Sequence, residues 1–294
     1  TQEEAKRIQE QIERYVGKPR PTGPAVTVTP AGEDYSISIS IEELVRPLAM
    51  FGITATSAPA VMTATPRADG LWSVTQQGMP EVQVKVNAQS IRILMEGVRY
   101  ESIYDPRYLS FMSARMTQTG LQVDSVAPGF MNVRRLGPSE NIFALQPAGS
   151  KAVSGAGQYT TQSSNESFRI TEGGKDISIT VATGKITGDA TVDTFQIPDL
   201  MELWAFFVAN PSASAIEEKV EELKGLVRTA LPVFNTISQQ VSVSDVAVAS
   251  PVGNFGLKEG AFKFNMTGLR KDGDLGLRFS FAGFALPQDL LPAW

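Results

Sequence analysis

Strict alternation of apolar and polar residues recurs along most of this chain. The clearest runs are residues 35–41, 82–86, 177–181, 241–244 and the start of 279–284. A period of two places successive side chains on opposite faces of a strand, so each run predicts one apolar and one polar face. Strands of this kind are typical of antiparallel sheets, because parallel sheets are usually covered on both faces.

Turn-forming residues separate these runs. The pairs that fit hairpin turns are Ala31-Gly32, Asp69-Gly70, Gly173-Gly174 and Asp272-Gly273, since hairpins favour residues that accept positive φ. Residues 90–197 contain only strand and turn signals. We therefore expect long strands in an extended meander. The Gly-rich segment 154–157 lacks the Lys-Ser/Thr of a phosphate-binding loop, and its glycines predict a tight turn.

Three segments show helical rather than strand periodicity. In residues 1–16, Thr1 and Glu4 fit a capping box, and a Pro/Gly-rich linker ends the helix. Residues 198–209 predict a short apolar helix. Residues 214–231 predict a third helix with a capping box at Ser214 and Glu217, an apolar stripe and a charged face toward water.

Together these signals predict a mainly β (α+β) fold. We expect long antiparallel strands in a curved sheet or open barrel, with about three peripheral helices. The expected regions are 1–24 (N-terminal helix and linker), 25–197 (long-stranded β region), 198–233 (helical insertion) and 234–294 (C-terminal β region of the same fold).

Histidine and cysteine are both absent from the 294 residues. Their absence excludes a Ser-His-Asp triad, a cysteine nucleophile and a zinc or haem site held by imidazole or thiolate. An enzyme would have to use carboxylates, Lys, Tyr or an oxygen-ligated metal, and no motif for a metal or cofactor is present. The net charge of −5 argues against a nucleic-acid partner.

Two clusters are the candidate binding residues. The apolar helix 200–209 contributes Leu200, Leu203, Trp204, Phe206 and Phe207, and the polar-aromatic stretch after residue 96 contributes Tyr100, Tyr104 and Arg107. The helix could act as an apolar lid that touches lipid or a partner, or could simply pack on the sheet. The second cluster could hold a polar head group, or could form a solvated strand face.

The carboxylates Glu96, Glu101 and Asp105 lie in the same stretch as the second cluster. A pair of carboxylates within about 5–10 Å of each other could hydrolyse glycosidic bonds. The alternative is again a solvated strand face with cross-strand pairs.

No run of about 18 apolar residues, the length of a transmembrane helix, occurs in the sequence. The first residue is Thr1 rather than Met, which fits either a mature exported protein after removal of a signal peptide or a piece cut from a longer chain. Of the two, we expect an exported, soluble mature form.

The C-terminal fifth of the chain resembles a known family. The segments that carry the resemblance are 241–258, with its Ser250-Pro-Val-Gly253 turn, 264–269, 277–287 and the Leu290-Leu-Pro292 motif. This rhythm resembles an uncharacterised family of exported alphaproteobacterial proteins that is labelled only as a domain of unknown function. The resemblance implies a periplasmic location and a long β architecture, similar in layout to envelope proteins whose curved sheets shield lipid. It implies no catalytic residue.

Three functions follow as hypotheses. The first is a non-catalytic periplasmic binding or carrier protein for a lipid or other hydrophobic molecule, with peripheral membrane contact. The second is a structural or protein-interaction component of the cell envelope, and the third is a carboxylate-based glycan-active enzyme. The first two differ in one physical respect: the apolar strand faces either line a binding surface or pack into a solid core.

Overall fold

The computed structural model of the chain describes residues 1–268 and 272–287. Its helices are α1 (Gln2–Val16), α2 (Ile41–Val45), the 3-10 helix η1 (Arg46–Phe51), α3 (Ile197–Ala209), α4 (Ala213–Glu218) and α5 (Val220–Ala230). The first ten strands are β1 (Val26–Ala31), β2 (Asp34–Ile39), β3 (Ile53–Ser57), β4 (Ala60–Pro66), β5 (Trp72–Gln77), β6 (Val82–Val86), β7 (Gln89–Glu96), β8 (Arg99–Asp105), β9 (Ser110–Gln118) and β10 (Gly120–Ala127). The others are β11 (Phe130–Leu136), β12 (Ser139–Pro147), β13 (Val153–Thr161), β14 (Ser164–Glu172), β15 (Lys175–Thr183), β16 (Ile186–Phe195), β17 (Thr236–Ser250), β18 (Gly253–Thr267) and β19 (Leu275–Ala285).

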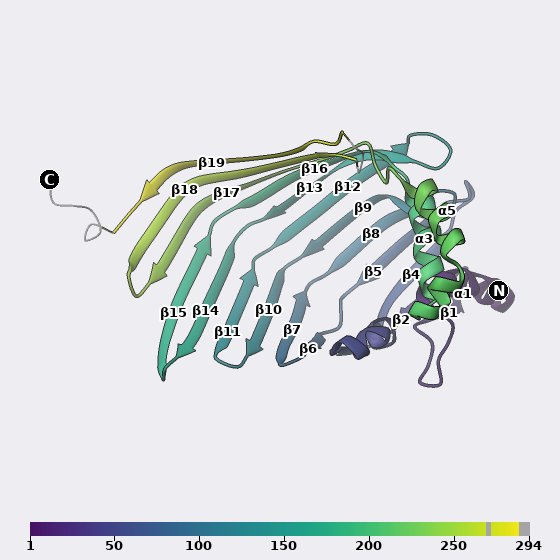
Figure 1. Cartoon of the computed structure of the whole chain (residues 1–294), viewed down its shortest axis with the longest axis horizontal. Coiled ribbons are helices and arrows are strands. Elements are labelled where there is room, and N and C mark those ends of the chain that lie inside the picture. The colour runs from purple at the N-terminus through teal and green to yellow at the C-terminus, as the bar shows by residue number, and fades with distance from the viewer. Residues whose placement is uncertain (269–271, 288–294) are drawn as a thin grey trace.

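All of these strands belong to one antiparallel sheet that is not closed into a barrel (Figure 1). Many consecutive strands are two halves of one longer strand. For example, β16 pairs with the first part of β17 and β15 pairs with its last part. The pairs β3–β4, β5–β6, β7–β8, β9–β10, β11–β12 and β13–β14 are related in the same way. The sheet is therefore a meander of long, interrupted strands.

The interruptions line up across the sheet and form a crease. Within each half-strand, every second residue projects from the same face. At the crease, the next residue on that face comes three positions later instead of two. These steps run from Ser57 to Ala60, Met95 to Val98, Gln118 to Leu121, Leu136 to Ser139, Thr161 to Ser164, Thr183 to Ile186, Val243 to Val246, Leu257 to Gly260 and Phe281 to Phe284. Each extra residue acts as a bulge, which bends a strand while keeping the same side chains on the same face.

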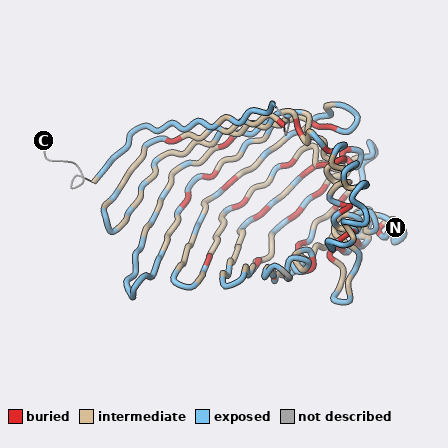
Figure 2. The backbone as a smooth tube through the Cα atoms, viewed as in Figure 1, coloured by how far each residue is buried: buried red, intermediate tan, exposed pale blue. Residues whose placement is uncertain are grey.

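Glycine and polar side chains make the crease feasible. Gly97 and Gly283 have positive φ values of 60° and 69° there, which other residues adopt only at a cost. Backbone bonds cross the crease, as where Gly137 N–H donates to the carbonyl of Ser163 at 2.8 Å. Buried residues recur where successive half-strands meet (Figure 2). They include the polar residues Gln76, Gln118, Ser139, Thr161 and Ser164.

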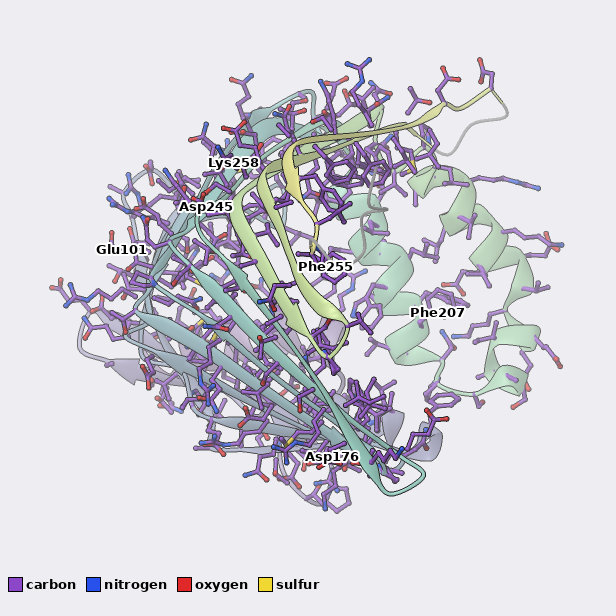
Figure 3. The ribbon with its side chains drawn as sticks, turned by 90° about the vertical axis from the view of Figure 1, so that its left-hand side faces the viewer. Glu101, Asp176, Phe207, Asp245, Phe255 and Lys258 are labelled. Carbon is purple, nitrogen blue, oxygen red and sulfur yellow. The ribbon has the colours of Figure 1, made fainter. Side chains whose placement is uncertain are left out.

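The bent sheet has an inner face and an outer face of different character. The inner face is the set of positions in register with Val28, Ile37, Val74, Val84, Ile93, Val123, Val181, Val248, Phe255, Phe262 and Phe279. Seen along the molecule, Phe255 lies on the side toward the helices, whereas Glu101, Asp245 and Lys258 lie on the outside (Figure 3). The alternation in the sequence therefore corresponds to an apolar concave surface and a polar convex one.

The helices gather at the β1–β2 end of the sheet (Figure 1). There α1 packs Ala5 against Val26, Val28 and Tyr35, and this is the buried apolar cluster of the described residues. Ile8, Ile12, Val16, Ile37, Ile39 and Trp72 pack around it. α3 packs against both α1 and α5, and α2 and η1 pack beside β3. Among the helices in the described part of the chain, none is long and apolar enough to cross a membrane.

The predicted mainly β fold with long antiparallel strands is confirmed. The N-terminal cap is also confirmed, because the Thr1 hydroxyl accepts from the Glu4 N–H. There are five α-helices in the described residues rather than about three, since the short helix α2 adds to the count and the segment 214–231 divides at Lys219. Its N-cap is Ser212 rather than Ser214.

The prediction of a tight turn at residues 154–157 is wrong. These residues lie inside β13, paired with β12. Gly155 and Gly157 allow β12 to approach the backbone of β13 closely, rather than forming a turn. A Cβ on Gly155 would collide with the carbonyl oxygen of Ala144, and one on Gly157 would lie 3.1 Å from the Cβ of Phe143.

Candidate functional site

The inner face away from α1 is the candidate functional site. Its clearest part is β19, whose inward side chains are 56–69% exposed: Leu275, Leu277, Phe279, Phe281 and Phe284. Next to them, Phe255, Phe262 and Phe264 of β18 are only half-buried. Monomeric soluble proteins rarely expose contiguous apolar surface on this scale without a binding role.

The total accessible surface supports the same conclusion. The chain exposes 17793 Å², whereas a compact monomer of its 31.7 kDa mass would expose roughly 12,000 Å². The excess arises because a single curved sheet lacks a second layer over most of its inner face. Of the larger side chains that the structure describes, Val153 alone is fully buried. The inner face is therefore an accessible apolar surface rather than one side of a solid core.

The predicted residues of α3 lie at the covered end of this surface. Phe206 is buried at 5% exposure, whereas Trp204 and Phe207 are 54% and 40% exposed. Leu200 and Leu203 are half-buried. The indole N–H of Trp204 donates to the carbonyl of Tyr15 at 2.8 Å, which fixes α3 against the end of α1.

Tyr100 and Tyr104 project from β8 onto the inner face. Both rings pack on Phe111, with centroids 5.9 and 5.4 Å apart. Burial raises the pKa of Tyr104 to about 12, with a smaller contribution from Tyr15 of α1. Tyr15, at the end of α1, thus interacts with both Trp204 of α3 and Tyr104, and in this way links these parts of the two predicted clusters.

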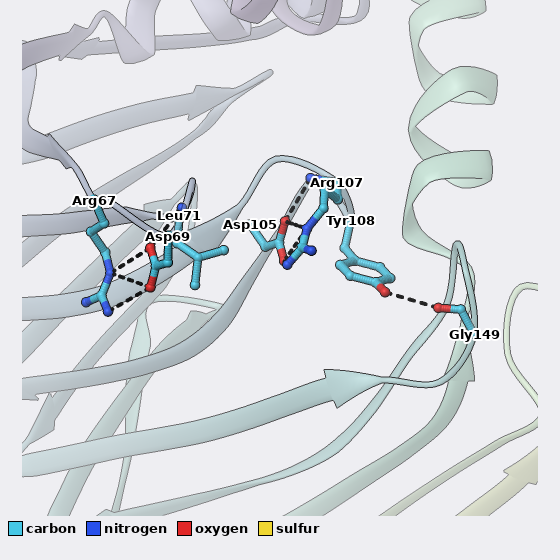
Figure 4. A network of polar contacts seen from close by, with 7 residues as sticks. All are labelled: Arg67, Asp69, Leu71, Asp105, Arg107, Tyr108 and Gly149. Atoms are coloured by element: carbon cyan, nitrogen blue, oxygen red, sulfur yellow. Dashed lines mark hydrogen bonds and ion pairs between the residues drawn. The ribbon is translucent and has the colours of Figure 1, made fainter.

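Arg107 lies beyond Tyr104 in the chain, in the turn between β8 and β9 (Figure 4). Its guanidinium pairs with the carboxylate of Asp105 at 2.7 Å and is largely exposed. This ion pair lowers the pKa of Asp105. In the same turn, the Tyr108 hydroxyl donates to the Gly149 carbonyl at 3.1 Å, which ties this turn to the loop after β12.

The three carboxylates considered for glycan chemistry do not form a pair. Glu96 and Glu101 lie on the outer face on either side of the crease, and Asp105 is held by Arg107. The five residue steps from Glu96 to Glu101 correspond to roughly 16 Å along an extended strand, which is longer than the separation that a glycosidase uses. No cluster of three or more acidic side chains that could hold a metal ion occurs in the described ranges.

The sequence reasoning missed a polar site on the inner face of β11 and β14. Arg134 and Glu166 are directly paired across these strands, and Asn132 donates to the Glu166 carboxylate at 3.0 Å. The local sequence Phe-Met-Asn-Val-Arg-Arg-Leu (130–136) alternates weakly on both faces, so it does not show which arginine points inward. Pairing with the neighbouring, strongly apolar strands shows that Arg134 is the arginine that projects inward.

No protein-family model, curated protein or solved structure matches the chain.

Proposed function

We propose that this protein is a non-catalytic binding or carrier protein for a lipid or another hydrophobic molecule, and that it works in the periplasm. The ligand lies on the inner face of the sheet, between the crease and the strand ends. The observation that carries the proposal is the uncovered row of apolar side chains along β17–β19, with 56–69% exposure on β19.

Burial of this surface supplies the binding energy. Removing apolar surface from water contributes roughly 25 cal/mol per Å², so covering even a few hundred square ångströms stabilises a complex by several kcal/mol before the entropy costs of association. The covered end, formed by α1 and α3, closes the surface on one side. Trp204 and Phe207 would then contact a ligand or membrane at that end.

Native mass spectrometry of protein purified gently from its own host tests the proposal. We expect a lipid-mass adduct at a fixed ratio, identified after solvent extraction. A matched pair of variants shows where the lipid binds. Phe281→Asp introduces a charge on the inner face of β19, and Ala282→Asp introduces the same charge on the outer face of that strand. Both positions are exposed, so both variants should fold.

The adduct should be lost with Phe281→Asp and retained with Ala282→Asp. A protein without adduct that also binds no added lipid after delipidation would contradict the proposal. Equal loss in the two variants would show that the adduct is not seated on the inner face.

One observation favours a second candidate function, an interaction component of the envelope. β19 pairs only with β18 in the described residues, so the other backbone edge of its eleven residues is open. An open strand edge is a template for strand addition by a partner. A stoichiometric protein partner recovered without co-purifying lipid, and lost when β19 is disrupted, would support this alternative.

A further inference from the structure

Away from the strand ends, the described part of the inner face carries one charged site, formed by β11 and β14. Arg134 and Glu166 belong to a cross-strand row whose other members are Ser57, Val82, Ile93, Val123, Val181, Val248 and Phe255. Residues paired in register project from the same face of a sheet. Arg134 therefore shares a face with Phe255, which lies on the inner side in Figure 3.

Charge is otherwise scarce on this face. Apart from Glu172 and Lys175 at the β14–β15 turn, Arg134 and Glu166 are the charged residues at inward positions of the described strands. The outer positions carry many more, such as Arg92, Arg115, Asp124, Glu140, Arg169, Asp189 and Lys263. A cation within an apolar face is costly once a ligand excludes water, unless an anion pairs with it.

The Arg134 guanidinium has no partner within the described residues. Its side chain is exposed, and no hydrogen bond or ion pair reaches it, although Glu166 faces it across the strands. The Glu166 carboxylate instead accepts a hydrogen bond from the Asn132 amide at 3.0 Å. Five N–H donors in a planar fork thus remain available to an acceptor on the inner face.

We propose that Arg134 binds the acid group of an anionic amphiphile, a carboxylate or a phosphate, whose acyl chain lies on the apolar inner face. This inference rests on the proposed function and specifies its ligand class. Guanidinium pairs with carboxylate and phosphate oxygens through two parallel hydrogen bonds. From Arg134, the chain would lie along the inward residues Val181, Val248 and Phe255, toward the exposed apolar side chains of β19.

Three ligands with the same oleoyl chain separate head group from chain. Oleate carries a carboxylate, oleoyl-lysophosphatidylglycerol carries a phosphate, and mono-oleoylglycerol is neutral. Each is titrated against delipidated wild-type protein, Arg134→Gln and Arg135→Gln. Arg135 is the matched control, because it follows in the same strand, projects outward and donates to Gln122 at 3.3 Å.

Arg134→Gln should weaken binding of one or both anionic ligands about tenfold or more, since hydrogen bonds to charged groups contribute at least that factor. Binding of mono-oleoylglycerol should stay within about twofold, and Arg135→Gln should leave all three affinities unchanged. Loss confined to oleate identifies a carboxylate ligand, and loss confined to the lysolipid identifies a phosphate. Either result supports the proposal.

Unchanged anionic binding by Arg134→Gln, or an equal loss for all three ligands, would overturn the inference. The proposed function fails separately, if the wild-type protein binds none of the three. Thermal unfolding shows whether Arg134→Gln folds. If it does not fold, Glu166→Gln provides a second test. Removing the facing negative charge should raise the affinity for the anionic ligands severalfold and leave the affinity for mono-oleoylglycerol unchanged.

Discussion

The two ends of the sheet start from the same sequence pattern and reach different states. At the β1–β2 end, α1 covers the apolar face and buries Val26, Val28 and Tyr35. At the β17–β19 end, side chains of the same kind stay exposed, with Phe281 at 69%. Alternation creates an apolar face, but a second layer decides whether that face becomes a core.

The two edges of the sheet differ in the same way. β1 is short, contains Pro30 and lies under α1, and α2 and η1 pack beside the edge strand β3. These features block pairing with another chain. β19 is longer, has no proline and is exposed along its length. Within the described residues, one end is therefore covered by the helices of the chain itself, whereas the backbone edge of β19 is uncovered.

Truncating one aromatic residue at each end gives the largest contrast. Tyr35 is buried at 7% exposure, packs on Trp72 at 5.8 Å and accepts a hydrogen bond from the N-terminal ammonium. Tyr35→Ala should lower the free energy of unfolding by about 3–5 kcal/mol, as for other buried aromatics. Phe281→Ala should change it by less than about 1 kcal/mol. Urea unfolding measures both, and equal losses would show that the β19 end is packed.

Alkaline titration tests how well the helices cover the first end. The pKa of Tyr104 is raised to about 12 because the side chain is buried. The folded state therefore holds this proton more tightly than the unfolded state. The resulting stability is present below the ordinary tyrosine value near 10 and is lost as the pH rises through about 12. The difference between the two pKa values corresponds to a loss of roughly 3 kcal/mol.

Ultraviolet absorbance of phenolate during an alkaline titration measures this shift. One of the six tyrosines should titrate well after an exposed one would, and Tyr104→Phe should remove that late step. If the variant titrates like the wild-type protein, then α1 does not exclude water from Tyr104, and the two ends are less different than their burial indicates.

Much of this fold could be predicted from the sequence, because the signals are local. Alternation in 35–41 and 241–244, the Thr1 cap and the Asp69-Gly70 turn each depend on neighbouring residues. The crease could not be predicted, because it depends on bulges that line up across strands far apart in sequence, as Gly97 and Gly283 do. The exposure of Phe279 and Phe281 could not be predicted either, because it depends on the lack of a layer that covers them.

For the candidate site, the sequence composition alone identifies α3 and Tyr104. Arg134 can be identified only from the strand register, which shows that it projects from the inner face.

Glycine substitutions along the crease should have intermediate effects that differ from the middle of the sheet to its edge. Gly97 has a φ of 60°, and an added Cβ would lie 2.7 Å from the Thr119 Cγ2. Gly283 has a similar φ but lies on the edge strand, where its neighbour is the Lys258 side chain at 2.7 Å. Gly97→Ala should destabilise the protein by about 2 kcal/mol, and Gly283→Ala by about 1 kcal/mol, on the order of the backbone strain alone.

Thermal unfolding of the two glycine variants orders these effects. Gly70→Ala is a control for positive φ without crowding, because its φ is 80° and an added Cβ would contact nothing within 4 Å. A Gly97→Ala loss no larger than that of Gly70→Ala would show that the crease at Thr119 relaxes freely.

Acid should loosen the covered end locally, and this is the smallest expected effect. The Arg107 guanidinium holds the pKa of Asp105 below its ordinary value, so the folded state favours the charged carboxylate. Its contribution to stability is present above the ordinary carboxyl pKa near 4 and is lost as the pH falls through the lower folded value. Because Arg107 is largely exposed, solvent screens the pair and only local opening is expected. Hydrogen exchange, corrected for the intrinsic effect of pH on the exchange rate and compared between neutral and acidic pH, should increase in the β8–β9 turn, and Asp105→Asn should show that increase already at neutral pH. The same increase in β19 as in this turn would instead mean that acid unfolds the sheet as a whole, and that its two ends are one cooperative unit.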